Sequence, residues 1–182
     1  MVTYDDEPAL LQASRRGDTE AFASLVHRYQ KMVHSLTYRM CGSEADAADL
    51  AQLTFLQAWR KLEAFRGDSK FSTWLGRIAI NTCLNWQDGA VREARARAAW
   101  GEERLNDPSP AVEDGPVQLV QQSLLRLSPK QRAAIVLTVC EGMSHAEAAR
   151  LLQCSEATVS WRVFVARKKL RHWLGPLQRE RE

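Results

Sequence analysis

The sequence predicts an all-α protein with two helical domains, an N-terminal bundle and a C-terminal helix-turn-helix domain, joined by a linker. Apolar residues recur at helical spacing through residues 19–97 and again through 117–173. Residues 101–116 are acidic, contain three prolines and show no such period. We therefore expect an N-terminal domain over 1–97, a linker over 98–116, a C-terminal domain over 117–175 and a charged tail over 176–182.

The first two predicted helices are bounded by clear stop and start signals. A short helix over residues 5–16 ends at Gly17, and either Asp18 or Thr19 caps the next one. That second helix runs to Cys41-Gly42 and carries one apolar stripe, formed by Phe22, Leu25, Val26, Tyr29, Val33, Leu36 and Met40. A third helix begins after Ser43, which has Asp46 three residues further on.

The third helix, residues 44–62, carries more apolar side chains than one stripe holds: Ala47, Leu50, Leu53, Phe55, Leu56, Trp59 and Leu62. One explanation is a surface for a partner protein. The other is a helix buried on two sides within its own bundle. Periodicity alone does not decide between them.

A polar loop, Phe65–Lys70, precedes a helix that we expect to run over residues 71–97. This helix is aromatic near its start, at Phe71 and Trp74, and carries Arg77, Arg92, Arg95 and Arg97. Basic groups interleaved with aromatic rings suit single-stranded nucleic acid, because bases stack on rings while cations hold phosphates. The alternative is that Phe71 and Trp74 belong to the core.

The C-terminal domain opens with a helix over 117–127 and continues with three short helical patterns between Leu127 and Trp173. Ser128 with Gln131, Ser144 with Glu147, and Ser155 are the predicted caps, and Gly142 is a left-handed stop. The turn before the third pattern is only Gln153-Cys154, which is typical of a helix-turn-helix.

The third pattern of this domain has an apolar stripe and a basic face. The stripe is Val159, Val163, Ala166, Leu170 and Trp173, and we expect it to pack on Ala148, Ala149, Leu152, Val136, Leu137 and Cys140. The other face carries Arg162, Arg167, Lys168, Lys169 and Arg171. Such a helix suits a phosphate-lined groove, although a solvated basic face in an ordinary bundle is the alternative.

The charges are distributed unevenly along the 182 residues. The net charge of +3 divides into +1 for residues 1–97, −4 for 98–116 and +6 for 117–182. The basic excess thus coincides with the predicted helix-turn-helix, which favours nucleic acid as a partner.

The cysteines and histidines give no metal-binding pattern. Cys41, Cys83, Cys140 and Cys154 show no zinc spacing, and we expect them to be buried thiols in a reducing cytoplasm. The acidic start predicts no signal peptide, and no apolar run reaches membrane-spanning length. No nucleophile–base pair or phosphate-cradling glycine loop occurs, so we expect neither an enzyme nor a cofactor.

Five blocks, in this order, resemble the bacterial sigma-70 family, specifically its small extracytoplasmic-function (group IV) members. They are RGDTEAFASLVHRYQ, DAADLAQLTFLQAWRKLEAFRG, DSKFSTWLGRIAINTCLNW, LSPKQRAAIVLTVCEGMSHAEAARLL and ATVSWRVFVARKKL. The resemblance covers residues 8–173. It implies a sigma-2-type helical domain and a sigma-4-type helix-turn-helix domain. It also implies binding to core RNA polymerase, promoter-specific initiation of transcription and control by an anti-sigma factor.

The resemblance assigns roles to three sets of residues. Asp49, Gln52, Leu53 and Leu56 match the helix that docks on core polymerase. Phe65, Arg66, Asp68, Ser69, Lys70, Phe71, Trp74, Arg77 and Asn81 match the reader of the −10 element, where a base of the non-template strand is flipped out. Ser155, Glu156, Ala157, Thr158, Ser160, Trp161, Arg162, Arg167 and Lys168 match the reader of the −35 element. Gln153 stands where glycine is commoner in the turn.

Two other classes of function compete with this hypothesis. A conventional regulator would use the helix-turn-helix as a dimer on a two-fold operator, with a sensing N-terminal domain. A metallohydrolase would use His27 and His34, which lie seven residues apart and need further ligands. Co-purification with core polymerase and metal analysis distinguish these classes from the first.

Overall fold

The computed structural model describes residues 6–99 and 115–179, and in this part of the chain all regular structure is helical. The all-α prediction is therefore confirmed. The chain divides into two compact units, one made of Met1–Tyr38 and Ser43–Thr82 and the other of Arg39–Gly42 and Cys83–Glu182. Most of the predicted linker lies outside the described residues.

The first unit begins with α1 (Glu7–Arg15), α2 (Thr19–Cys41) and α3 (Glu44–Lys61), and a 3₁₀ turn, η1 (Leu62–Ala64), follows α3. Gly17 adopts the left-handed conformation (φ +92°) and separates α1 from α2. The Asp18 carboxylate accepts from the N–H groups of Glu20 at 2.9 Å and Ala21 at 3.0 Å. Asp18, and not Thr19, therefore caps α2.

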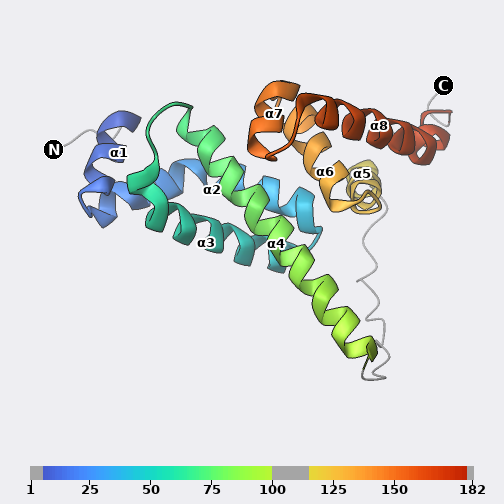
Figure 1. The fold of residues 1–182 in the computed structure, drawn as a ribbon, viewed down its shortest axis with the longest axis horizontal. Helices are drawn as coiled ribbons and strands as arrows, with labels where there is room; N and C mark the ends of the chain where they lie inside the picture. The colour runs from blue at the N-terminus through green and yellow to red at the C-terminus, as the bar shows by residue number, and fades with distance from the viewer. Residues whose placement is uncertain (1–5, 100–114, 180–182) are drawn as a thin grey trace. The chain divides into compact units, whose positions relative to one another are not determined.

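The core of the first unit follows the predicted stripe of α2. Leu25, Val33 and Leu36 are buried there. Thr37 is also buried, and its hydroxyl donates to the Ala47 carbonyl oxygen of α3 at 2.9 Å. The rings of Phe22 on α2 and Trp59 on α3 lie 4.8 Å apart. These contacts hold α2 against α3 (Figure 1).

Helix α4 (Phe71–Ala99) is long, and its two halves differ in burial. At 1.5 Å per residue it extends about 43 Å. Its first three turns are apolar and buried, with Phe71, Leu75 and Ile80 at most 2% exposed. Beyond Asn85 the large apolar side chains Trp86 and Val91 are 39% and 48% exposed. Gly89 does not end the helix, which continues two residues past the predicted end at 97.

The C-terminal part of the second unit contains α5 (Pro116–Leu125), α6 (Pro129–Ile135), a π-helical turn η2 (Val136–Cys140), α7 (His145–Leu151) and α8 (Glu156–Arg179). Helices α5, α6 and α7 all pack against α8, as Figure 1 shows. Val159, Val163 and Ala166 of the predicted stripe are buried in this contact. The helix-turn-helix prediction is confirmed by α7, the turn at 152–155 and α8.

Two of the three predicted serine caps form in this domain. Ser144 and Glu147 make the reciprocal capping box of α7, and Ser155 Oγ accepts from the Thr158 N–H at 3.2 Å. Ser128 precedes α6 but makes no side-chain cap hydrogen bond. Its predicted partner Gln131 instead accepts from Lys169 of α8 at 3.2 Å. The tertiary contact with α8 has displaced the local capping box.

A buried cation joins α5 to α6. Arg132 is 6% exposed and donates to the carbonyl oxygens of Leu124 (2.9 Å), Leu125 (2.7 Å) and Leu127 (3.2 Å). These carbonyls lie at the end of α5 and in the connection after it, where helix carbonyls lack i+4 partners. The Leu124 carbonyl also accepts from the Leu127 N–H at 3.1 Å. Burial lowers the pKa of Arg132. Its hydrogen bonds offset the cost of removing this charge from water.

The π-helical turn corrects one predicted core position. A π turn adds a residue to the helical repeat, so the side chains after it rotate relative to an α-helix. Val139 is 53% exposed and Cys140 is exposed as well, against the prediction that Cys140 packs beneath α8. In α7 the buried leucine is Leu151, and Leu152 is only half-buried.

The expectation of buried thiols holds for one cysteine. Cys83 is buried, and burial raises its pKa to about 12. Cys41 and Cys154 are half-buried and Cys140 is exposed, and all four are free thiols.

At the C-terminal end, α8 continues through Gly175-Pro176 to Arg179, beyond the predicted domain end. Proline removes one backbone hydrogen bond, and the helix continues with the remaining ones.

Candidate nucleic-acid interface

The outer face of α3 carries both polar and apolar side chains. Asp49 and Gln52 are exposed, and the neighbouring Leu53 and Leu56 are 46% and 54% exposed. The opposite side of the helix is buried, at Ala47, Leu50, Ala51, Thr54 and Ala58. In the described part of the chain, the surplus leucines are therefore left on the surface, which favours the partner explanation over burial on two sides.

The loop between η1 and α4 is an exposed polar segment held by two buried rings. Arg66, Asp68, Ser69 and Lys70 are exposed. Phe65 before the loop and Phe71 after it are 6% and 2% exposed. Their ring centroids lie 5.6 Å apart, and each ring also contacts Trp74, at 5.1 and 5.5 Å.

Burial changes the role of Phe65 and Phe71. Both were predicted to contact DNA, but their rings have almost no exposed surface on which a base can stack. The two rings instead pack against each other at the two ends of the loop. For Phe71 this agrees with the alternative interpretation of the sequence, in which this ring belongs to the core. Trp74 is half-buried, so part of its ring contacts the core and part remains open.

Side chains from α1 and α2 brace this aromatic cluster. The Arg15 guanidinium donates to the Phe65 carbonyl oxygen and lies 5.6 Å from the centre of the Phe65 ring. The Tyr29 ring packs edge-on against Phe71 at 5.5 Å, and its hydroxyl donates to Glu7. Burial, and then the Glu7 carboxylate, raise the pKa of Tyr29 to about 12.

The start of α4 presents a mixed face beside the loop. Trp74, Arg77 and Asn81 follow one another at intervals of three and four residues, so they share one side of the helix. Arg77 is exposed, and Trp74 and Asn81 are half-buried. This side offers a ring, a cation and an amide that both donates and accepts. The group is suited to an unstacked base and its phosphate.

On α8, most of the predicted −35 residues are exposed. Ser155, Glu156, Ala157, Trp161, Arg167 and Lys168 are exposed, and Thr158, Ser160 and Arg162 are half-buried. Trp161 is 61% exposed although it lies between the two buried valines of the stripe. The first turns of α8 therefore leave an open face opposite the core.

Two cations of the predicted basic face, Arg162 and Lys169, make contacts within the domain, and so does Arg126, which lies outside that face. Arg162 points back to the turn, where its Nη1 donates to Cys154 Sγ at 3.6 Å. Lys169 donates to Gln131. Arg126 of the α5–α6 connection lies 4.6 Å from the Trp173 ring centre. Arg167, Lys168 and Arg171 are exposed cations of α8, and Lys169 is exposed as well although it is bonded to Gln131.

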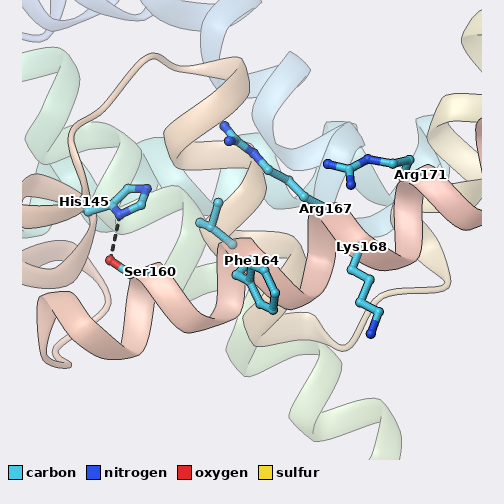
Figure 2. A pocket seen from close by; sticks show the side chains of 7 residues that line it. His145, Ser160, Phe164, Arg167, Lys168 and Arg171 are labelled. Carbon is cyan, nitrogen blue, oxygen red and sulfur yellow. Dashed lines mark hydrogen bonds between the residues drawn. The ribbon is translucent and has the colours of Figure 1, made fainter.

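A hollow of about 470 Å³ lies beside these cations, lined by His145, Ser160, Val163, Phe164, Arg167, Lys168 and Arg171. Figure 2 shows the bond across it, in which His145 Nδ1 and Ser160 Oγ lie 2.8 Å apart. Sequence reasoning placed Arg171 on the basic face but missed His145 and Phe164 as interface residues. The sequence did carry a signal for Phe164, because this large apolar residue lies off the apolar stripe of its helix. In the structure it is 67% exposed.

The histidines considered for a metal site lie apart from any such cluster. His27 is exposed, and His34 Nε2 lies 3.1 Å from Glu44 Oε2. Within residues 6–99 and 115–179, no three His, Cys, Asp or Glu side chains gather closely enough to hold a metal ion. No helix described for these residues is long and apolar enough to cross a membrane.

Comparison with known families decides between the open hypotheses. The family model for Sigma-70 region 2 matches residues 25–97, and that for Sigma-70 region 4 matches residues 118–170. The first match includes α3, the loop and most of α4, and the second includes most of α5, all of α6 and α7, and α8 up to residue 170. The chain belongs to the sigma-70 family.

Relatives match this sigma factor over almost its whole length. The RNA polymerase sigma-H factor of Pseudomonas aeruginosa is 36% identical, over 99% of this chain and 100% of its own. The extracytoplasmic-function RNA polymerase sigma-E factor of Escherichia coli K12 is 35% identical, over 95% of this chain and 96% of its own. This sigma factor is therefore of the extracytoplasmic-function type.

A solved structure agrees with the fold. The sigma factor RpoE of Bartonella quintana, crystallised in complex with the anti-sigma factor NepR, matches with a TM-score of 0.70 and 25% identity. The match covers 86% of this chain and 98% of that one. The structure of CnrH in complex with the cytosolic domain of CnrY matches with a TM-score of 0.66 and 30% identity, over 92% and 96% of the two chains.

Proposed function

We propose that this chain binds core RNA polymerase and directs promoter-specific initiation by reading a −10 element with its N-terminal domain and a −35 element with its C-terminal domain. For these two domains we propose the bounds expected from the sequence, residues 1–97 and 117–175. The chemistry of RNA synthesis belongs to the polymerase, so the chain itself is not an enzyme. Its place of action is the bacterial cytoplasm.

The observation that carries this proposal is the exposed leucine pair of α3. A pair of leucines about half exposed, beside Asp49 and Gln52, forms an apolar patch with a polar rim. We assign Asp49, Gln52, Leu53 and Leu56 to the contact with core polymerase.

The loop and α4 are assigned to the opened −10 element. Arg66, Ser69, Lys70 and Arg77 are free to approach phosphates or an extruded base, and Asn81 offers an amide to a base edge. Asp68 is exposed in the same loop and accepts from base amino groups. The buried rings of Phe65 and Phe71 hold the two ends of this loop in place. The half-buried ring of Trp74 is the one on which a base can stack.

The exposed face of α8 is assigned to the −35 duplex. A helix whose first turns are open and whose later turns carry Arg167 and Lys168 can approach base edges while cations hold the backbone. Arg162 is turned toward Cys154, so its contact with phosphate requires a different rotamer from the one in the free protein.

An anti-sigma factor is the proposed regulator. The solved structures of RpoE with NepR and of CnrH with CnrY are complexes of this kind. The α3 patch of this chain is an apolar surface that such an inhibitor has to cover in order to block polymerase. A protein that co-purifies with this chain under non-inducing conditions and competes with core polymerase is the expected inhibitor.

Runoff transcription with purified core polymerase tests the proposal. The full chain should direct initiation at defined start sites in a genomic library of templates, and core polymerase alone should not. A chain that binds duplex DNA by itself, as a dimer, and never associates with core polymerase would instead be a conventional regulator. Such a result would refute the proposal.

A further inference from the structure

The recognition helix presents an exposed apolar stripe opposite its core. Ala157, Trp161, Phe164 and Lys168 follow at intervals of four, three and four residues, and all four are exposed. Trp161 is 61% and Phe164 67% exposed. Two large aromatic side chains on one exposed stripe mark a contact surface.

The same face lacks a cation over the first turns of the helix. Arginine or lysine bonding to O6 and N7 is the usual way of reading guanine in the major groove. Between Glu156 and Phe164 the only cation is Arg162, whose guanidinium points to Cys154. Arg167, Lys168 and Arg171 come one to two turns later.

The small polar side chains of these turns are already hydrogen-bonded. Ser155 and Thr158 hydroxyls lie 2.8 Å apart, and Ser155 also caps the helix. Ser160 is bonded to His145 at 2.8 Å. Glu156 is exposed, but a carboxylate only accepts, which limits it to the amino groups of cytosine or adenine. The stripe can therefore contact base edges mainly through its apolar rings, Trp161 and Phe164.

The hollow beside the stripe is suited to the DNA backbone. His145 lies on one side of it, and Arg167 and Arg171 project from α8 on the other, while Lys168 points the opposite way from these two arginines (Figure 2). Cations in this arrangement hold phosphates and fix the register of a helix in the groove. A strand seated there brings Phe164, which also lines the hollow, and Trp161 toward base edges.

From this arrangement, which rests on the proposed function of α8, we infer that the −35 element is read mainly through thymine. Trp161 and Phe164 contact C5-methyl groups of thymines in the major groove, the one apolar group that the base edges present there. Arg167, Lys168 and Arg171 carry the phosphate contacts. The preferred upstream element is therefore rich in A·T pairs at the positions beneath the two rings.

The test uses holoenzyme, assembled from core polymerase and the full chain, and promoter duplexes randomised over the upstream element. Selection by binding and initiation should enrich thymine at two or more upstream positions. Each of these thymines is then replaced by deoxyuridine, which removes the methyl group and leaves the base-pairing edge unchanged. We expect each replacement to weaken binding roughly fourfold, the value for exposing one buried methyl group.

Variants then connect the methyl groups to the two rings. Trp161→Ala or Phe164→Ala should abolish the deoxyuridine effect at one position each, whereas the control Val117→Ala, 73% exposed on α5, should leave it unchanged. Both side chains are exposed, so the unfolding midpoint should not change. The deoxyuridine measurement on the unmodified chain does not depend on any variant.

Two results would overturn the inference while leaving the proposed function intact. One is a selected promoter whose binding is insensitive to deoxyuridine but is weakened by 7-deazaguanine, which removes the N7 acceptor of guanine. The other is a deoxyuridine effect that persists in both alanine variants. Failure of the holoenzyme to select or initiate from any duplex would overturn the proposed function itself, and this inference with it.

Discussion

Replacement of Leu53 and Leu56 by alanine should weaken binding to core polymerase without weakening the fold. Both side chains lie on the outer face of α3, beside Asp49 and Gln52 and away from the buried Leu50. They contribute little to the core of the first unit. Their loss should therefore appear in the complex and not in the free protein.

The size of the effect follows from the exposed fractions. Burying a whole leucine side chain stabilises by about 1.5–3 kcal/mol. Leu53 is 46% and Leu56 54% exposed, so each has about half of its surface left to bury. That is about 1 kcal/mol per residue, or about 2 kcal/mol for the pair, which corresponds to a roughly 30-fold rise in Kd.

The assay is competition between labelled unmodified chain and the unlabelled double variant for core polymerase, followed by fluorescence anisotropy. A matched control is the double variant Val117→Ala with Val120→Ala, an apolar pair on α5 that is 73% and 46% exposed. Thermal unfolding of both variants checks that the fold is kept. A Kd within about threefold of the unmodified chain, or an equal loss in the control, would refute the assignment of α3.

Four further predictions concern single residues. Arg132→Ala should lower the free energy of unfolding by about 3 kcal/mol in chemical unfolding, because the carbonyl oxygens of Leu124, Leu125, Leu127 and Met40 lose a charged donor; a loss below about 1 kcal/mol would show that these bonds contribute little. Gln153 has φ +51°, a conformation that is strained for any residue with a Cβ atom. Gln153→Gly should therefore raise the free energy of unfolding by about 0.5 kcal/mol, because the released strain exceeds the entropy that glycine adds to the unfolded chain. Gln153→Ala keeps the Cβ atom and should not raise it. Tyr29 has a pKa raised to about 12, so its stabilising contribution is complete below its unfolded pKa of about 10 and is lost as the pH rises from there to 12. Tyr29→Phe should remove that alkaline loss in unfolding measured against pH, and an unchanged profile would contradict it. Asn81→Ala should reduce promoter opening, measured by permanganate footprinting of unpaired thymines, more than it reduces core binding; equal losses would indicate a structural role.

The sequence carried most of the local structure because caps and periodicity act over a few residues. Asp18, Ser43 and Ser144 cap the helices that they were predicted to cap, and Gly142 takes the left-handed conformation at φ +68°. The stripe of α8 was also predictable, since Val159, Val163 and Ala166 recur at helical spacing. Each of these signals depends on neighbours in sequence.

The predictions failed where caps and a regular helical count do not determine what a side chain contacts. Gln131 had a local partner in Ser128 but bonds to Lys169, which lies on another helix. Cys140 was placed in the core by an α-helical count that the π turn changes. Phe65 and Phe71 were predicted to face DNA, yet ring packing with Trp74 buries them. Only the Gln131–Lys169 bond is distant in sequence. The ring cluster and the π turn are local, but a regular helical count does not predict either.

What the sequence determined by itself is the class of the molecule: helical, with two apolar-periodic regions, a basic C-terminal end and blocks that match the sigma-70 family. Composition and spacing suffice for the helical class and its two regions because they set which faces are apolar and where helices begin. The family follows from the resemblance of the sequence blocks. Which of the surplus side chains remain exposed was decided only by tertiary structure. Leu53, Leu56, Trp161 and Phe164 have the same chemistry as the buried leucines and rings, and only the packing of neighbouring helices separates the two groups.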